Sequence, residues 1–284
     1  MALEGVLTAM VTPFGDDGRV NEDAAVRLMH HLADHGSDGF VLAGTTGEGA
    51  TLGDEEKARL WEVGVAERPE GATIVAGTGS NDTAHSVHLT ERATEIGVDA
   101  MLVVTPYYNK PSRRGLTEHF KAVAAATDRP VILYNIPQRC VIDLSNEFLR
   151  ELAQTIENVA AVKQSRYEQI EAIDGLDLLA GNDDSLAEVL DAGGTGGILV
   201  SSHVVGEEMR RMIDEPDERH AIADALADVF RAMFITSSPT PVKAALNMLG
   251  HDVGGVRLPM VEATEDERAE IRGALERHGL LSQV

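Results

Sequence analysis

Lys163 has the most distinctive chemical setting in the sequence. It ends a short apolar run, residues 159–162, in which the alternation of a strand would carry the next side chain toward the core. Burial disfavours the ammonium form of a lysine and lowers its pKa, and the neutral amine is a nucleophile for ketones. The position therefore predicts a lysine that forms an imine (Schiff base). A lysine that extends from a strand end to solvent is the alternative.

Hydroxyl side chains follow or end other predicted strands, and they could serve the same chemistry. A neutral phenol can shuttle protons while an imine forms, and hydroxyls in line with it can relay those protons to solvent. Ordinary half-buried or exposed side chains are the alternative for any one of them. The candidates are Thr45, Thr46, Tyr107, Tyr108 and Tyr134.

Arg139 lies just past the strand that contains Tyr134. At the mouth of a site, its guanidinium could bind a substrate carboxylate through two parallel hydrogen bonds. A surface arginine paired with one of the many acidic residues is an equally simple interpretation of its position alone.

A repeating unit of strand, loop and helix must position these residues, and it recurs about every 30 residues. The predicted strands cover residues 6–12, 39–42, 73–76, 100–104, 131–135, 159–163, 176–180 and 197–200. The helices predicted between them cover about 21–36, 54–68, 81–96, 116–127 and 145–155. Only helices are predicted after Val200, over residues 207–213, 217–235, 239–249 and 264–278.

Eight strands in such units predict an α/β fold, a parallel (β/α)8 TIM barrel with a C-terminal helical extension. We expect the barrel to cover residues 1–215 and the extension, packed on it, to cover 216–284. A doubly wound sheet would need only about five or six strands and a phosphate-binding glycine turn after the first, which is missing here. In a barrel the active site lies at the C-terminal ends of the strands, where the candidates converge.

The composition is strongly acidic, with 47 acids against 24 bases and a net charge of −23. This charge opposes binding to nucleic acid or anionic membranes and suits a protein that works at high salt, so we expect a halophilic source. An acidic enzyme at ordinary salt is the alternative. The sequence shows no apolar run near 18 residues, no secretory signal and a single cysteine, Cys140, so we expect a cytoplasmic protein.

Metal and phosphate sites are not indicated. The histidines at 30, 31, 35, 85 and 88 lack partnering cysteines or carboxylates in a pattern that identifies a metal. The glycine-rich stretches at 77–79 and 193–197 lack the lysine and hydroxyl that end a P-loop. We interpret both stretches as tight turns.

Taken together, the motifs resemble the dihydrodipicolinate synthase and N-acetylneuraminate lyase family of class I aldolases. The likeness runs from about Leu3 to Met260, and five motifs occur in the right order at the right strand ends. They are GTTGE at 44–48, AGTGSN at 76–81, VTPYYN at 104–109, YNIPQR at 134–139, and Lys163.

The resemblance implies an enzyme that condenses pyruvate with L-aspartate 4-semialdehyde on the route to lysine and diaminopimelate. Lys163 would form the imine with pyruvate, and Tyr134 would be the general acid and base. Thr45 and Tyr108 would complete the proton relay, Tyr108 from a neighbouring subunit of a homotetramer, a dimer of dimers. The imine itself is the electron sink, so no metal or organic cofactor is expected.

The resemblance also implies how the substrates are held. Thr46 would bind the pyruvate carboxylate through its hydroxyl and backbone N–H, and the backbone of Ile198 would lie close to pyruvate. Arg139 would bind the carboxylate of the aldehyde substrate. The choice among family members depends chiefly on Arg139, because the sialic acid lyases and keto-deoxy-sugar aldolases do not usually keep an arginine there.

Three segments differ from the usual family pattern. Residues 164–166 (Gln-Ser-Arg) replace an acid and a small-residue turn after the lysine, and Cys140 and Val141 replace a small pair after the arginine. Residues 202–203 (Ser-His) stand where an asparagine is common.

The resemblance also concerns regulation. In members inhibited by lysine, the effector lies near the positions of Gly49, Ala50, Asn81 and Tyr107, together with an acid. Here His85 takes the acid's place, while Asp54 and Lys57 replace histidines found in some members, so we expect lysine to inhibit poorly.

Two other functions stay open at this point. One is a pyruvate-dependent class I aldolase that cleaves a 2-keto-3-deoxy sugar acid or N-acetylneuraminate. The other is a non-catalytic barrel that binds pyruvate and acts as a regulator or binding protein.

Overall fold

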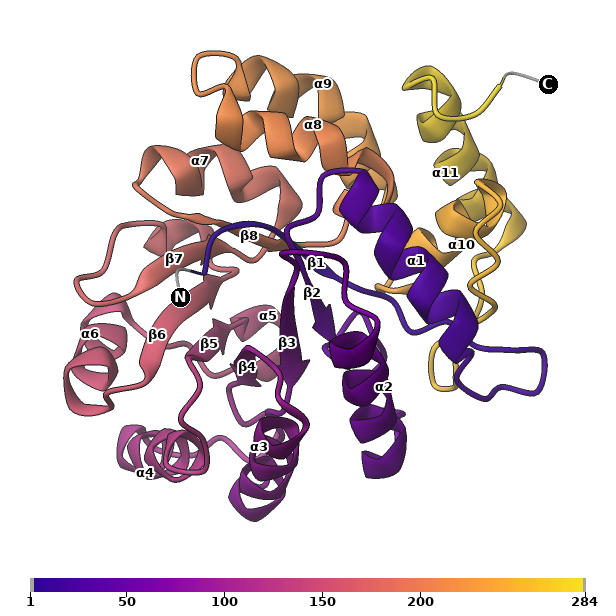
Figure 1. The fold of residues 1–284 in the computed structure, drawn as a ribbon. Coiled ribbons are helices and arrows are strands. Elements are labelled where there is room, and N and C mark those ends of the chain that lie inside the picture. Colours follow the sequence, from indigo (N-terminus) through magenta and orange to yellow (C-terminus); the bar gives the residue numbers. More distant parts are fainter. Residues whose placement is uncertain (1–2, 283–284) are drawn as a thin grey trace.

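Eight parallel strands close into a barrel in the order β1 to β8, in the computed structural model of the chain, which describes residues 3–282 (Figure 1). The strands are β1 (Gly5–Ala9), β2 (Gly39–Leu42), β3 (Thr73–Gly77), β4 (Ala100–Val104), β5 (Val131–Asn135), β6 (Val159–Gln164), β7 (Asp177–Ala180) and β8 (Gly196–Leu199). Pairing of β8 with β1, with Leu7 opposite Ile198, closes the barrel. The predicted TIM barrel is confirmed.

Helices surround the barrel in Figure 1. They are α1 (Glu22–Asp34), α2 (Asp54–Ala66), α3 (Thr83–Ile96), α4 (Arg113–Ala124), α5 (Pro137–Cys140), α6 (Asn146–Thr155), α7 (Leu186–Asp191), α8 (Ser202–Asp214), α9 (Arg219–Ala232), α10 (Thr240–Met248) and α11 (Glu265–Arg277). Because helices cover the strands from outside and side chains fill the barrel from inside, the strands read as continuous apolar runs. In β5, for example, all five residues are buried.

The helix starts follow capping residues that the sequence displays. Asn21 caps α1 by accepting a hydrogen bond from the backbone N–H of Ala24. Thr264 and Glu267 form a capping box at the start of α11, each side chain accepting from the other residue's backbone N–H. These caps satisfy backbone groups that would otherwise lack partners, and the predicted helices begin within a residue or two of them.

The first strand is shorter than predicted. It ends at Ala9 and not at Thr12: the N–H of Met10 still donates to the carbonyl oxygen of Val41 in β2, but the N–H of Val11 leaves the sheet. The N–H of Val11 donates to Nε2 of His203 at 3.2 Å, while Nδ1 of His203 lies 2.7 Å from the carbonyl oxygen of Val200. Burial lowers the pKa of His203 to about 4, so the neutral ring can join β1 to the start of α8.

Other element boundaries also differ from the prediction. The short helices α5 and α7 were not predicted, α4 begins at Arg113 and not at Leu116, and α8 begins at Ser202 and not at Glu207. In α4 the first turn is exposed, so no apolar residue marks it until Leu116. Very short helices carry too little periodicity to be recognised from sequence.

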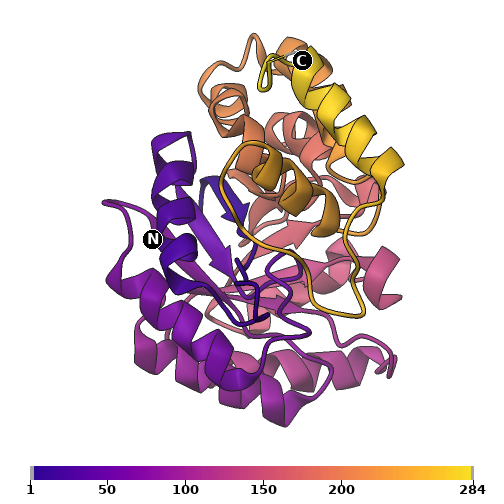
Figure 2. The same ribbon diagram turned by 90° about the vertical axis from the view of Figure 1, so that its right-hand side faces the viewer.

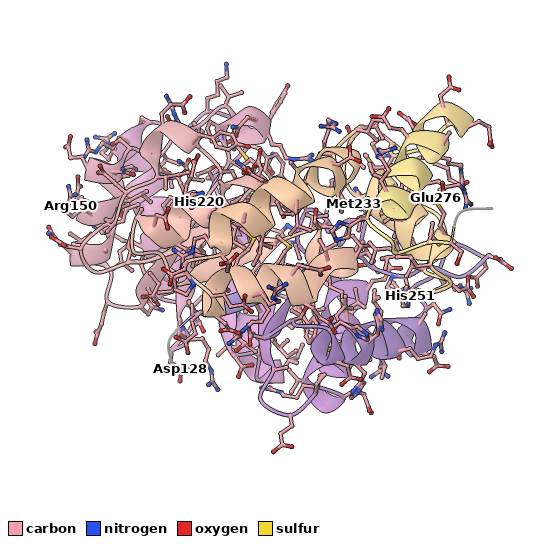
Figure 3. The ribbon with its side chains drawn as sticks, turned by 90° about the horizontal axis from the view of Figure 1, so that it is seen from above. Asp128, Arg150, His220, Met233, His251 and Glu276 are labelled. Atoms are coloured by element: carbon pink, nitrogen blue, oxygen red, sulfur yellow. The ribbon has the colours of Figure 1, made fainter. Side chains whose placement is uncertain are left out.

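The helices after β8 pack on one another. α9 packs against α8 and α11, and α10 packs against α11 and α8. Figure 3 looks onto this group and labels Met233, at the end of α9, and His251, in the segment after α10. The rings of His251 and His31 pack against each other at a tilt of 42°, with centroids 4.2 Å apart, which joins this segment to α1. The division of the chain at residue 215 stays a prediction.

Among the residues described, no helix combines the length and apolar character needed to cross a membrane.

Candidate active site

Lys163 lies inside the barrel near the C-terminal end of β6, opposite Tyr134 of β5. Only 5 % of it is exposed. Burial lowers the pKa of Lys163 to about 7, with Asp183 opposing the shift and Arg139 adding to it. A large fraction of the side chain is therefore a neutral amine near neutral pH, which is the form that attacks a carbonyl.

Tyr134 provides a buried phenol directly beside this amine. Nζ of Lys163 lies 4.3 Å from the centroid of the Tyr134 ring, and Tyr134 is 5 % exposed. Burial raises the pKa of Tyr134 to about 12, so the phenol stays protonated at neutral pH. The arrangement therefore pairs a nucleophile that can lose its proton with an acid that keeps one.

Asp183 is a further buried charge near Lys163, and the sequence interpretation missed it. Its carboxylate, after β7, accepts hydrogen bonds from the backbone N–H of Val200 at 2.8 Å and of Ser201 at 2.7 Å. It also accepts from Oγ of Ser201 at 2.5 Å. These bonds join the ends of β7 and β8, and they favour the charged carboxylate although burial raises the pKa of Asp183. A single aspartate in a loop carries no sequence signal for this role.

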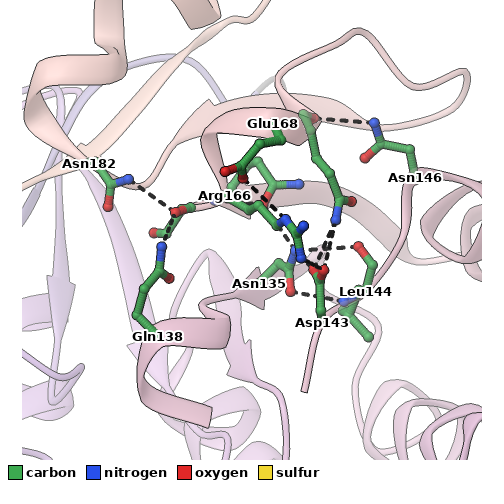
Figure 4. Close-up of polar contacts among 11 residues, drawn as sticks. Asn135, Gln138, Asp143, Leu144, Asn146, Arg166, Glu168 and Asn182 are labelled. Carbon is green, nitrogen blue, oxygen red and sulfur yellow. Dashed lines mark hydrogen bonds and ion pairs between the residues drawn. The ribbon is translucent and has the colours of Figure 1, made fainter. Parts of the chain in front are cut away.

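The altered segment after Lys163 is held by a network of amides and charges (Figure 4). The carbonyl oxygen of Ser165 accepts hydrogen bonds from the side-chain amides of Gln138 and Asn182, each at 3.1 Å. Arg166 pairs with Asp143, which also accepts from the amide of Gln169 at 2.9 Å. The unusual segment 164–166 is therefore anchored by the side chains of Gln138, Asn182 and Asp143.

Thr45 and Thr46 follow β2 and differ in environment. Thr45 is exposed and lines a cavity of about 310 Å³ that Tyr107 and Tyr134 also line. Thr46 is buried, 5 % exposed, and is not among the residues that line this cavity. The structure thus brings Thr45 to the same cavity as Tyr134, as the convergence at the strand ends predicts.

Tyr108 is not among the residues that line the cavity shared by Thr45 and Tyr134. It is 89 % exposed, and its φ of +75° is unusual for a residue that is not glycine. The part of Tyr108 in the site therefore stays a prediction. A contribution to a neighbouring subunit's site is compatible with this exposure.

Arg139 and Ile198 occupy opposite environments. Arg139 lies on α5, directly after β5, and is exposed, and no acid within residues 3–282 forms an ion pair with it. Its guanidinium is therefore available at the C-terminal side of the barrel. Ile198 is fully buried in β8, where its backbone pairs with Leu7.

The glycines at 77 and 79 are explained by close packing. A Cβ on Gly77 would lie 2.6 Å from the carbonyl oxygen of Ala43, and a Cβ on Gly79 would lie 2.4 Å from the backbone nitrogen of Val104. Neighbouring backbone therefore fills the space that a side chain would need. Within residues 3–282 no group of three or more histidine, cysteine, aspartate or glutamate side chains is arranged to hold a metal ion.

The 310 Å³ cavity is also lined by charged and titratable side chains, those of Asp54, Lys57 and His85. Nε2 of His85 lies 2.9 Å from Oδ1 of Asp54, and this hydrogen bond lowers the pKa of Asp54. Burial lowers the pKa of Lys57, with Asp54 opposing the shift. The carboxylate of Asp54 is therefore already engaged by His85.

Comparison with known proteins agrees with these features. Residues 2–278 match the model of the dihydrodipicolinate synthetase family. The 4-hydroxy-tetrahydrodipicolinate synthase of Moorella thermoacetica is 46 % identical over 97 % of this chain and 98 % of its own. That of Bacillus subtilis is 41 % identical over 97 % and 99 %. The structure of dihydrodipicolinate synthase from Cyanidioschyzon merolae with lysine bound superposes with a TM-score of 0.94, at 38 % identity over 98 % and 99 %.

Proposed function

The chain belongs to the dihydrodipicolinate synthetase family, and we propose that it is a lyase that condenses pyruvate with L-aspartate 4-semialdehyde, as 4-hydroxy-tetrahydrodipicolinate synthases do. This reaction serves the biosynthesis of lysine and diaminopimelate. The observation that carries the chemistry is the buried amine of Lys163, 4.3 Å from the ring of the buried Tyr134.

The reaction begins at Lys163. Its neutral amine attacks the keto carbon of pyruvate, the Tyr134 phenol donates a proton to the departing hydroxyl, and water leaves as the imine forms. The imine accepts the electron pair released when the pyruvate methyl loses a proton, and the resulting enamine carbon attacks the aldehyde. The amine of the second substrate then displaces Lys163. We propose that no metal or organic cofactor takes part, because the imine is the electron sink.

Other side chains complete the proposed site. Thr45, which lines the cavity with Tyr134, would relay protons, and Thr46 and the backbone of Ile198 would hold pyruvate. Tyr108, exposed in the single chain, would enter the relay of a neighbouring copy in a homotetramer. The cytoplasmic location and the halophilic source stay predictions.

The pH dependence of imine formation tests the environment of Lys163. Burial lowers the pKa of this amine to about 7. About half of the amine is therefore neutral at pH 7, and nearly all of it is neutral above pH 8. We expect the rate of imine formation with limiting pyruvate to rise from pH 5 and level off near pH 8. A rate that still rises toward pH 10 would indicate an ordinary, solvated lysine.

Replacing Arg139 tests the choice of aldehyde. In Arg139→Ala we expect the KM for aspartate semialdehyde to rise about 10- to 100-fold, the scale of a lost charge-assisted hydrogen bond. Imine formation with pyruvate should be retained. Arg272→Ala is the matched control, because Arg272 is an exposed arginine on α11. Unchanged use of aspartate semialdehyde by Arg139→Ala would favour a sugar-acid aldolase instead.

Lysine is expected to be a poor inhibitor. The carboxylate of Asp54 is hydrogen-bonded to His85 in the cavity, and Lys57 adds a basic side chain there. The ammonium groups of a bound lysine would therefore lack a free carboxylate partner. Initial rates with increasing lysine should therefore stay near the uninhibited rate at millimolar concentrations. Abolition of activity by millimolar lysine would contradict this expectation.

A further inference from the structure

A buried ion pair joins the C-terminal helices to the loop that carries Thr45 and Thr46. Nζ of Lys243, on α10, lies 2.7 Å from Oε1 of Glu48, and each side chain is 2 % exposed. Removing a lysine and a glutamate from water is costly, so such a pair is retained only with good geometry and further hydrogen bonds. Neither residue has a part in the proposed chemistry.

Both members of the pair have further partners. Nζ of Lys243 donates to the carbonyl oxygen of Gly255 at 2.6 Å and lies 4.1 Å from the ring centroid of Phe14. Oε2 of Glu48 accepts from the backbone N–H of Arg257 at 2.8 Å. The two charges are thus enclosed by the segment after α10 and by the loop after β1, and they form one connected unit.

Glu48 is connected closely to the catalytic side of its loop. Its backbone N–H donates to the carbonyl oxygen of Thr45 at 3.1 Å, and the carbonyl of the intervening Gly47 accepts from Oγ1 of Thr12 at 2.6 Å. The turn begins and ends with left-handed residues that are not glycine, Ala43 at φ +56° and Glu48 at φ +55°. Such conformations persist only where surrounding contacts hold them.

A second contact secures the same segment. The guanidinium of Arg257 pairs with Glu56 at the start of α2 and donates to the carbonyl oxygen of Gly18 at 2.8 Å. In Figure 2 the segment between α10 and α11 extends from the C-terminal helices toward the barrel. The segment therefore contacts the β2–α2 loop at Glu48 and the first turn of α2 at Glu56.

We propose that Lys243 is a positioning residue, which holds the Thr45–Thr46 loop in its working conformation through the ion pair with Glu48. The part of this inference that concerns turnover rests on the proposed function. The competing explanation is that the pair contributes only to global stability. The two differ in what happens when both charges are removed together.

Three variants separate these explanations. Lys243→Met leaves the buried Glu48 carboxylate without its counterion. The double variant Glu48→Gln/Lys243→Met removes both charges, while the oxygen of the new side-chain amide can still accept from the N–H of Arg257, so global stability should recover. Lys121→Met is the matched control, because Lys121 lies on the exposed face of α4 and pairs weakly with Glu118 at 3.5 Å. Each protein is compared by Tm, by hydrogen exchange of residues 43–50, by imine trapping and by steady-state kinetics.

The positioning role predicts faster exchange at residues 43–50 in both Lys243 variants. It also predicts a kcat lower by about 10- to 100-fold, the scale of a small misplacement of catalytic groups, while pyruvate is still trapped on Lys163. In the double variant, Tm should recover while kcat and exchange do not. Lys121→Met should match the wild type in all four measurements.

Recovery of kcat together with Tm in the double variant would overturn the inference, as would unchanged exchange in either variant. If Lys243→Met does not fold, the double variant decides alone. Failure of the wild type to form an imine with pyruvate would instead contradict the proposed function, and the exchange comparison would still decide whether Lys243 holds the loop.

Discussion

Replacing Lys163 with alanine is expected to lower kcat by on the order of 10⁴-fold or more, the scale of losing a covalent nucleophile. The reason is that the buried Nζ of Lys163 lies 4.3 Å from the centroid of the Tyr134 ring, where the amine can attack pyruvate beside the proton donor. A buried lysine whose pKa falls to about 7 is needed for both imine formation and the electron sink that follows. Steady-state turnover of pyruvate and aspartate semialdehyde measures the effect.

Lys121→Ala is the control for this variant, since Lys121 is an exposed lysine of α4. It should retain wild-type kcat. The Lys163 variant must also keep its cooperative thermal unfolding, so that the loss of activity is chemical. Substantial turnover by a folded Lys163→Ala protein would mean that the reaction does not pass through this amine.

Replacing Tyr134 with phenylalanine is expected to lower kcat by about 10²- to 10⁴-fold, the usual range for a general acid or base. The ring remains to pack beside Lys163, but the proton donor for loss of water is gone. Because burial raises the pKa of Tyr134 to about 12, the wild-type phenol is protonated across the working pH range. Stopped-flow measurement of imine formation should show the slower step directly.

Tyr167→Phe serves as the control for the phenol. Tyr167 is half exposed on the turn after β6, where its hydroxyl donates to Asp184 at 2.8 Å. Loss of that hydroxyl should leave kcat near the wild-type value. Wild-type kinetics in Tyr134→Phe would show that another group transfers the protons, and Thr45 would be the next residue to replace.

Much of the barrel was predictable because its elements carry local signals. β2, β4 and β5 begin and end at the predicted residues, since each is a short apolar run between a helix end and a polar turn. One boundary was wrong because a distant residue intervened. β1 ends early because His203, far along the chain, takes the N–H of Val11.

Part of the candidate site was also predictable from the sequence. Lys163 and Tyr134 stand at strand ends, so the barrel topology alone brings them together. Asp183, Glu48 and Lys243 were missed because their partners are distant in sequence and their burial is visible only in the folded chain. Tyr108 shows the converse, because its position after β4 predicts convergence while its side chain is exposed in the single chain.

Intact mass after incubation with pyruvate and borohydride tests the central claim most directly. Borohydride reduces an imine to a stable amine, so the wild type should gain one pyruvate-sized adduct per chain and Lys163→Ala should gain none. Peptide mapping should place the adduct on Lys163. A folded wild-type protein that gains no adduct, or an adduct that persists in Lys163→Ala, would contradict imine chemistry at this residue.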